Sequence, residues 1–186
     1  MSQPSATYHP ALKALHWIIF GLFTVMFVLG YGLAASDGYT ALGAQWGPVF
    51  DWHATLGLFV FVLAVTRIIV RRSTPMPSWS PALSPAERTL AHRTEQVLYA
   101  VMILKPLSGY VMAGKAGYNI DLFVQWRVGN PFGTSFVNDN DWFYQLALIV
   151  HIVTGVAFII AWVVHVVQVI RHTVISKDRL LQRMLP

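Results

Sequence analysis

Four long apolar runs, separated by polar stretches, are the feature of this sequence that most restricts its fold. They cover residues 14–34, 53–70, 97–113 and 143–170, and each is close to the roughly 20 residues that an α-helix needs to cross a bilayer. Charged residues make up 11% of the chain, against about 25% in soluble domains. The sequence therefore excludes a soluble globule. It predicts a single domain, residues 1–186, folded as an all-α transmembrane bundle of four helices.

Basic residues are distributed unequally between the two sides of the predicted membrane. One side has nine of them: Lys13, Arg71, Arg72, Arg88, Arg93, Arg171, Lys177, Arg179 and Arg183. The opposite side has Lys115 and Arg127, together with Asp37, Asp51, Asp121, Asp139 and Asp141. Because short cytoplasmic loops retain Lys and Arg, we expect both termini to lie in the cytoplasm.

The absence of cysteine limits the cofactors that the chain can hold. With no Cys in the sequence, disulfides, thiolate-held zinc, iron–sulfur clusters and covalently attached c-type haem are excluded. Any cofactor must be held non-covalently by His or oxygen ligands. The net charge of +5 does not indicate nucleic-acid binding, because the basic residues are scattered between the apolar runs instead of gathered on one soluble face.

Four of the seven histidines lie within the predicted spans, where an ionisable side chain is costly and indicates a function. His16 opens the first span and His53 the second, whereas His151 and His165 both lie in the fourth. Their fourteen-residue spacing returns a helix to nearly the same face about 21 Å further along. Antiparallel packing then brings His53 level with His151 and His16 level with His165. The sequence predicts two histidine pairs, one in each leaflet.

Facing imidazoles with no thiolate or carboxylate in register favour bis-histidine haem iron over a zinc or di-iron site. We therefore expect two non-covalent b haems, one held by His16 with His165 and one by His53 with His151. The alternative for intramembrane histidines is a proton path. Such a path would include carboxylates within the membrane, and Glu95 is the one candidate near a span.

Other residues are placed to support these haems. Gly57 and Gly155 each follow a predicted ligand by one helical turn, where a missing side chain leaves room for a porphyrin. Arg67 lies fourteen residues after His53 and so reaches the level of the inner haem, where it is placed to pair with a propionate. Lys105 lies in the outer half of the third span and is placed to serve the other haem; snorkelling to the outer interface is the alternative interpretation.

Two further histidines lie near the cytoplasmic ends of the spans. His92 opens the third span and competes with His16 as a ligand of the inner haem, although His16 is preferred. His172 follows His165 by seven residues and shares its face at the membrane surface. It is either a solvated residue of a basic tail or a contact of a quinone.

Several short motifs combine along nearly the whole chain. They are His16-Trp17 opening the first span, His53 and Arg67 in the second, Leu90-Ala91-His92 with Pro106 and Gly109 in the third, the His151 and His165 pair, and the tail from Lys177 to Pro186. Together they resemble the bacterial cytochrome b561 family, small four-span di-haem proteins of the inner membrane. The resemblance implies the same bis-histidine pairing and a multi-pass location in that membrane.

The resemblance also implies an activity. Members of the family include superoxide oxidase, which takes an electron from superoxide at the periplasmic face and passes it through both haems to ubiquinone. His172 matches a position associated with the quinone pocket. The proline-rich loop between the second and third spans, residues 73–85, lacks the lysines that such members can carry. Arg88 is then the nearest basic residue. We therefore expect an oxidoreductase of the superoxide:ubiquinone type, with Lys105, Lys115 or Arg127 attracting the anion.

Two other functions compete with this expectation. The chain is alternatively a cytochrome b electron carrier or anchor subunit that links the quinone pool to a partner dehydrogenase or hydrogenase, with the outer loop 114–142 as the dock. A transporter that uses the histidines without haem is the third possibility. A purified protein with no haem absorption would support the transporter.

Overall fold

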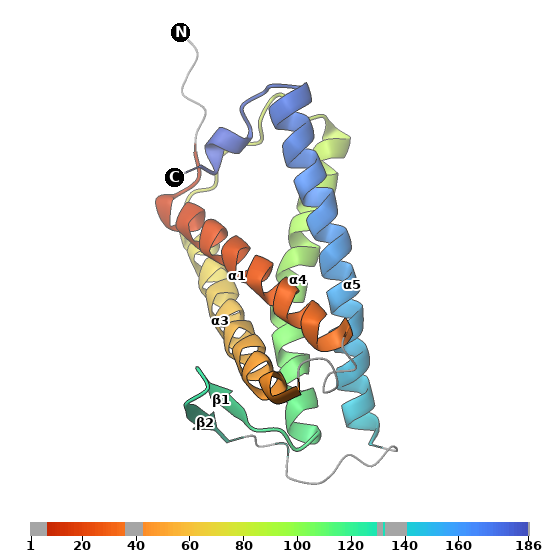
Figure 1. The fold of residues 1–186 in the computed structure, drawn as a ribbon. Coiled ribbons are helices and arrows are strands. Elements are labelled where there is room, and N and C mark those ends of the chain that lie inside the picture. Colours follow the sequence, from red (N-terminus) through yellow and green to blue (C-terminus); the bar gives the residue numbers. More distant parts are fainter. Residues whose placement is uncertain (1–6, 36–42, 130–131, 133–140, 186) are drawn as a thin grey trace.

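The computed structural model describes residues 7–35, 43–129, 132 and 141–185; Asp37 and Asp139, counted above, lie outside this part. Its elements are α1 (Pro10–Ala35), η1 (Gly43–Gln45), α3 (Trp46–Ser73), α4 (Pro85–Lys115), β1 (Ile120–Leu122), β2 (Trp126–Val128), α5 (Trp142–Ile170), η2 (Arg171–Ile175) and η3 (Leu181–Arg183). The four α-helices run along the long axis of the molecule, and the start of α1 and the segment η3 lie at the same end of the bundle (Figure 1). We call this the terminal end, and the opposite one, where β1 and β2 lie, the hairpin end.

Each of the four long helices has the length and apolar composition needed to cross a membrane. This confirms the prediction of an all-α transmembrane four-helix bundle. The helices α1, α3 and α4 extend beyond both ends of the predicted spans, and α4 begins twelve residues before its apolar run. The orientation of the termini stays a prediction.

Local chemistry explains where two of the helices begin. Pro85 occupies the first turn of α4, and Ser84 before it forms a capping box with Glu87, which satisfies backbone N–H groups that the first turn leaves unpaired. At α5, the Asp141 carboxylate accepts from the backbone N–H groups of Phe143 (3.0 Å) and Tyr144 (3.1 Å). The loop between α3 and α4 contains no helix, as its prolines predict.

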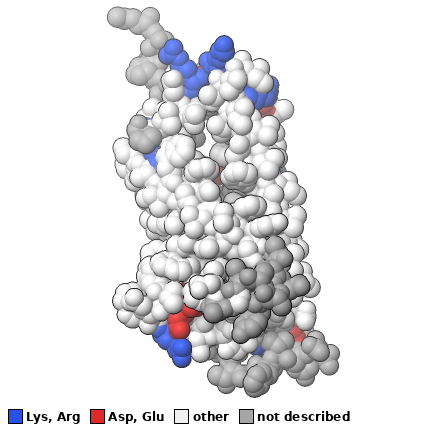
Figure 2. All heavy atoms as spheres, viewed as in Figure 1, with Lys and Arg blue, Asp and Glu red and all other residues white. Residues whose placement is uncertain are grey.

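The core of the bundle is small. Ile19, Val60, Ala64 and Met102 form its buried cluster, which joins α1, α3 and α4. Many larger apolar side chains point outward instead, among them Val28 and Ile160. Figure 2 shows Lys, Arg, Asp and Glu mainly toward the two ends of the visible face, with a mostly uncharged surface between them. A surface of this kind is suited to lipid contact along the middle and to water at both ends.

The sequence did not predict the β-hairpin in the loop that follows α4. Strands β1 and β2 pair antiparallel, with Asp121 opposite Arg127 and Leu122 opposite Trp126. The Arg127 guanidinium donates to both Asp121 oxygens, at 3.0 and 3.2 Å. These three-residue strands are too short for the alternating apolar pattern that marks a strand in a sequence.

Candidate functional site

At the terminal end, His16 of α1 faces His165 of α5. Their ring centroids are 6.1 Å apart and the ring planes are inclined by 66°. The structure therefore brings these two imidazole rings together, as the fourteen-residue spacing in α5 and the antiparallel packing predict.

At the hairpin end, His151 of α5 is held by a reciprocal contact with Lys105 of α4. The His151 Nδ1 lies 3.1 Å from the Lys105 carbonyl oxygen, and the Lys105 Nζ donates to the His151 carbonyl at 3.0 Å. A carbonyl only accepts, so Nδ1 carries the proton and Nε2 keeps a free lone pair. This is the arrangement in which proteins present a neutral imidazole to a metal.

His53 of α3 is the predicted partner of His151. The two imidazoles are close enough to interact electrostatically, and Lys105 lies within the same range of both. The His53 Nδ1 is buried and has no hydrogen-bond partner within the described part of the chain. Because a buried polar atom without a partner is costly, this nitrogen indicates a group that the polypeptide itself does not supply.

Glycines make room for the rings at the hairpin end. A Cβ atom at Gly109 would lie 3.0 Å from the His151 Cε1, and one at Gly30 would lie 3.0 Å from the His53 Cε1. Of the two glycines singled out in the sequence, Gly155 leaves space for Lys105 and Gly57 lies against Met26. The prediction that Gly57 and Gly155 leave room for a porphyrin stays a prediction, and the glycines that lie against the His53 and His151 rings are Gly30 and Gly109 on the neighbouring helices.

The helices α1 and α5 are joined less closely than the other neighbouring pairs. Contacts between helix backbones concentrate in α4 with α5, α1 with α3, and α3 with α4. Across the wider interval, Phe23 stacks on Phe158 with ring centroids 4.3 Å apart. Each of these rings lies seven residues, about two helical turns, from His16 or His165. The aromatic pair therefore separates the two histidine levels.

Arg67 lies at the level that the sequence predicts. It is close enough to His16 and His165 to interact electrostatically with both, and its guanidinium donates to the Leu12 carbonyl. Lys105 is partly buried beside His151, so its ammonium group does not snorkel to the interface. Each of the two predicted cations accompanies one histidine pair.

A cavity of about 310 Å³ opens at the terminal end and is lined in part by His16 and His165. Gln168 and His172 also line it, and the Nε2 atom of each is buried without a hydrogen-bond partner in the described structure. Two unpartnered polar atoms in one cavity indicate a polar ligand. The sequence predicts His172 here, whereas Gln168 is one turn from His165 in an apolar run and gives no motif.

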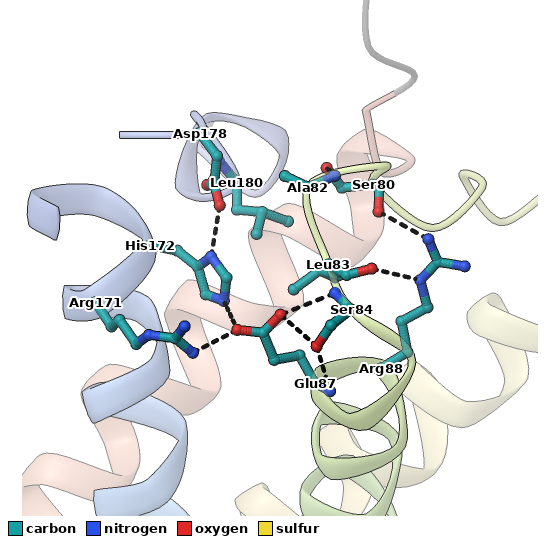
Figure 3. A network of polar contacts seen from close by, with 10 residues as sticks. All are labelled: Ser80, Ala82, Leu83, Ser84, Glu87, Arg88, Arg171, His172, Asp178 and Leu180. Atoms are coloured by element: carbon teal, nitrogen blue, oxygen red, sulfur yellow. Dashed lines mark hydrogen bonds and ion pairs between the residues drawn. The ribbon is translucent and has the colours of Figure 1, made fainter. Parts of the chain in front are cut away.

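Figure 3 shows that His172 lies between two carboxylates. Its Nδ1 is 2.5 Å from Asp178 Oδ2, and its Nε2 is 3.9 Å from Glu87 Oε1. Glu87 also pairs with Arg171 and belongs to the α4 capping box. An ionised carboxylate only accepts, so Asp178 holds the proton of His172 on Nδ1. Spacing alone does not reveal this role of Asp178, because the contact depends on how the tail folds back.

The chain beyond α5 closes the cavity from outside. The Trp17 Nε1 donates to the Met184 carbonyl at 3.0 Å, and the Arg183 Nη2 donates to the Ser78 carbonyl at 2.7 Å. Two tail residues, Lys177 and Arg179, have positive φ angles of 51° and 61°, which side chains other than glycine rarely adopt. Residues of this basic tail, Arg183 and Met184 among them, therefore line the cavity.

Two residues considered in the sequence lie apart from the cavity lining. The Arg88 guanidinium donates to the Leu83 carbonyl at 3.0 Å and to the Ser80 carbonyl at 3.4 Å, so it holds the loop before α4. His92 is exposed and is not among the residues that line the cavity. Glu95, the carboxylate considered for a proton path, is paired with Arg71 at 2.8 Å beside the same cavity.

Two of the cations predicted to attract an anion at the hairpin end are already paired. Lys115 lies 2.6 Å from Asp141, and Arg127 lies 3.0 Å from Asp121. The hydrogen bond from Lys115 lowers the pKa of Asp141, and the one from Arg127 lowers the pKa of Asp121. Of the three predicted cations, Lys105 is the one for which the described residues provide no carboxylate partner.

Comparison with known proteins agrees with this arrangement. The family model described as prokaryotic cytochrome b561 matches residues 7–186. Cytochrome b561 homolog 2 of Escherichia coli (strain K12) is 24% identical over 172 residues, which cover 92% of this chain and 87% of that protein. The chain therefore belongs to the prokaryotic cytochrome b561 family, multi-pass proteins of the bacterial inner membrane that bind b-type haem and transfer electrons.

Proposed function

We propose that this chain holds two b haems by bis-histidine ligation and oxidises superoxide at the hairpin end while reducing ubiquinone at the terminal end. The observation that carries the proposal is that one helix, α5, contributes a histidine to each of two pairs. His165 faces His16 near one end of the bundle, and His151 lies near the other end, within electrostatic range of His53. The domain that does this is the whole chain, residues 1–186.

The donor sets fit haem iron. Both pairs consist of neutral nitrogen donors, and the described residues contain no group of three or more His, Cys, Asp or Glu that would hold a bare metal ion. At His151 the Nδ1 proton is bonded to the Lys105 carbonyl, which supports ligation through Nε2. At His53 an unpartnered buried nitrogen and the Gly30 contact support a ring held for an external group.

Arg67 and Lys105 are proposed to hold haem propionates. Each is a cation at the level of one histidine pair, and neither has a carboxylate partner within the described residues. A cation within the membrane is costly unless an anion accompanies it. Arg67 would therefore pair with a propionate at the terminal-end haem, and Lys105 with one at the hairpin-end haem. When bound, haem b supplies a reversible one-electron iron couple.

Lys105 also supports an anionic electron donor at the hairpin end. Among the described residues, Asp141 and Asp121 take up Lys115 and Arg127, so Lys105 is the cation on this side that a haem propionate and an incoming anion would both meet. A cation in a low-dielectric wall raises the local concentration of a small anion and speeds its arrival. Superoxide, a small anion that gives up one electron, is a donor of this kind.

The cavity at the terminal end is the proposed site of the ubiquinone headgroup. A quinone presents two carbonyl oxygens, which need hydrogen-bond donors and, on reduction, protons. Gln168 has an amide donor without a partner, and His172 has an unpartnered Nε2. Asp178 would keep His172 oriented, so that His172 can pass a proton from water to the quinone oxygen. Arg88 bonds loop carbonyls and is proposed to act only by holding that loop.

The proposed reaction balances in electrons and protons. Two superoxide anions each lose one electron and leave as dioxygen, and one ubiquinone gains two electrons and two protons and leaves as ubiquinol. The protons enter at the terminal end, where His172 lies beside Glu87 and Asp178. The uncharged middle of the bundle, closed by the Phe23–Phe158 stack, excludes water between the two sites.

Stopped-flow mixing of the purified, oxidised protein with superoxide tests the proposal. We expect the haem absorption bands to show reduction within the mixing experiment, and added ubiquinone to reoxidise them and to accumulate as ubiquinol. The His92→Ala variant is the matched control, because this histidine is exposed and lies outside the cavity lining. Haem that stays oxidised in the presence of superoxide would refute the donor.

If superoxide fails to reduce the haem, the alternative of an electron carrier for a partner enzyme gains support. Haem that is reduced by superoxide but not reoxidised by ubiquinone would instead refute the acceptor alone. A protein purified without haem absorption would refute both steps and favour the transporter.

A further inference from the structure

The β1–β2 hairpin lies against the outer surface of α3, at the depth where that helix becomes apolar. The Phe123 ring at its tip contacts Trp52 and Phe59 of α3, with centroid distances of 5.8 and 5.6 Å. Trp52 and Phe59 are seven residues apart, which is about 10 Å along a helix. Both are more than 40% exposed, so the tip covers an outward-facing surface of a membrane-spanning helix.

Four backbone N–H groups of the hairpin are hydrogen-bonded within the chain. The Phe123 N–H donates to the hydroxyl of the fully buried Thr55 at 3.2 Å, and the Asp121 N–H donates to the Asp51 carboxylate at 3.2 Å. Within the tip, the Val124 N–H bonds the Asp121 carbonyl and the Gln125 N–H bonds the Leu122 carbonyl, at 2.9 and 3.0 Å. A loop in water does not need this bonding, whereas a segment in contact with lipid does.

The tip also has the composition of a membrane interface. Residues 122–126 contain no charged side chain, and Trp126 stacks edge-on against Phe123 while its own surface is 62% exposed. The charged pair Asp121 and Arg127 flanks this segment. Trp side chains are enriched at the boundary between headgroups and acyl chains. The polarity of the hairpin therefore changes from its charged base to its apolar tip.

The turn between β1 and β2 has an unfavourable backbone conformation at two of its residues. Phe123 and Val124 have φ angles of 52° and 61°, a left-handed region that a β-branched residue such as Val avoids. Glycine or Asn would satisfy the same turn without strain. The strain at Val124 is explained if the exposed Val124 side chain lies in a favourable apolar environment.

We propose that the hairpin tip, residues 122–126, is inserted into the lipid interface beside α3 and anchors the hairpin end of the bundle to the bilayer. The occupant of this apolar surface is the lipid itself, because the surface continues directly from the lipid-facing side of α3. This inference is independent of the electron donor and acceptor proposed above. It differs from the expectation that the whole outer loop is a dock for a partner protein.

The chain has no cysteine, so single-cysteine spin labels test the proposal directly. The Val124→Cys variant is labelled in the purified holoprotein, which is then reconstituted into phosphatidylcholine vesicles. Collision rates with oxygen, which concentrates in lipid, and with a water-soluble nickel chelate are measured by power saturation. Ile160→Cys on the outside of α5 is the lipid reference, and Ala86→Cys in the first turn of α4 is the aqueous reference.

We expect the oxygen-to-nickel collision ratio at Val124→Cys to lie several-fold above that of Ala86→Cys and toward that of Ile160→Cys. A ratio equal to the aqueous reference overturns the proposal and leaves the hairpin free to bind a protein. Gln125→Cys, next to the strained residues but without a positive φ angle, provides a second label if the substitution at Val124 disturbs folding. The same aqueous result there would also overturn it.

Discussion

At His151, two hydrogen bonds decide which ring nitrogen is available to a metal. The Lys105 carbonyl accepts a hydrogen bond from the His151 Nδ1–H group, and the Lys105 ammonium group donates to the His151 carbonyl. One residue of α4 thus orients the His151 ring and places a cation beside it. His172 is oriented in the same way at the terminal end, where its Nδ1–H group donates to Asp178 Oδ2 with an N–O distance of 2.5 Å. In both cases a neighbouring oxygen fixes the tautomer.

Replacing Lys105 with Met tests its proposed role as the cation of the hairpin end. We expect Lys105→Met to slow superoxide oxidation about tenfold at low ionic strength and to weaken the dependence of the rate on salt, because the attracting charge is lost. Lys115→Met is the matched control, since its charge is already balanced by Asp141. Equal effects of the two substitutions in stopped-flow measurements would refute a specific role for Lys105.

Replacing Asp178 with Asn tests its proposed role as a positioning residue. We expect Asp178→Asn to leave haem content and reduction by superoxide unchanged and to lower ubiquinol formation about tenfold or more, with a changed pH profile, because general acid catalysis depends on an oriented His172. The measurement is steady-state ubiquinol formation as a function of pH. Unaltered turnover and an unaltered pH profile would contradict the role.

At the scale of elements, the sequence predicts the helices well and their surroundings poorly. Apolar length identifies all four spans because lipid leaves the backbone no alternative to helix. The boundaries differ where polar chemistry decides them, as at Ser84, whose capping box starts α4 twelve residues before its apolar run. The hairpin was missed because its main partners, Thr55 and Asp51, are distant in sequence.

The candidate site divides in the same way. The fourteen-residue spacing in α5 predicts two levels of histidines, and His16 does face His165. Spacing within one helix does not reveal contacts between helices. Gly109 against His151 and Asp178 against His172 therefore appear only in the folded chain.

The contact between Gly109 of α4 and His151 of α5 can be tested by adding one methyl group. In Gly109→Ala the new Cβ would lie 3.0 Å from His151 Cε1, so the ring must move. We expect the haem-to-protein ratio to fall from two toward one, with the loss confined to one of the two haem spectra. Gly21→Ala in α1, where a Cβ meets no neighbouring atom within 4 Å, should keep both haems. Full haem content in Gly109→Ala would refute the contact.

The junction of α4 and α5 gives a prediction about pH. The Lys115 hydrogen bond lowers the pKa of Asp141, so the folded state favours the carboxylate. Its stabilising effect is complete above the ordinary Asp pKa of about 3.9 and is lost as the pH falls through the lower pKa of the folded protein. Asp141→Asn should therefore lower the thermal unfolding midpoint at pH 7. A difference from the unsubstituted chain that persists undiminished at the lowest pH would contradict this assignment.

At the scale of the whole molecule, the chain is organised as a relay between two ends. Charges gather toward the ends and leave an apolar middle (Figure 2). The terminal end has the cavity with the His16–His165 pair, and the hairpin end has His53 and His151 near Lys105. Between α1 and α5, the stacked rings of Phe23 and Phe158 lie between these two levels. Such an arrangement suits electron transfer across a membrane.

The central claim is that each histidine pair holds its own haem, and counting haems in single-ligand variants tests it most directly. A pyridine haemochromogen assay on the purified protein should give two haems per chain. His165→Ala and His151→Ala should each retain one, with different remaining spectra, while His92→Ala should retain both. Two haems in both α5 variants, or one haem in the unsubstituted chain, would contradict the account.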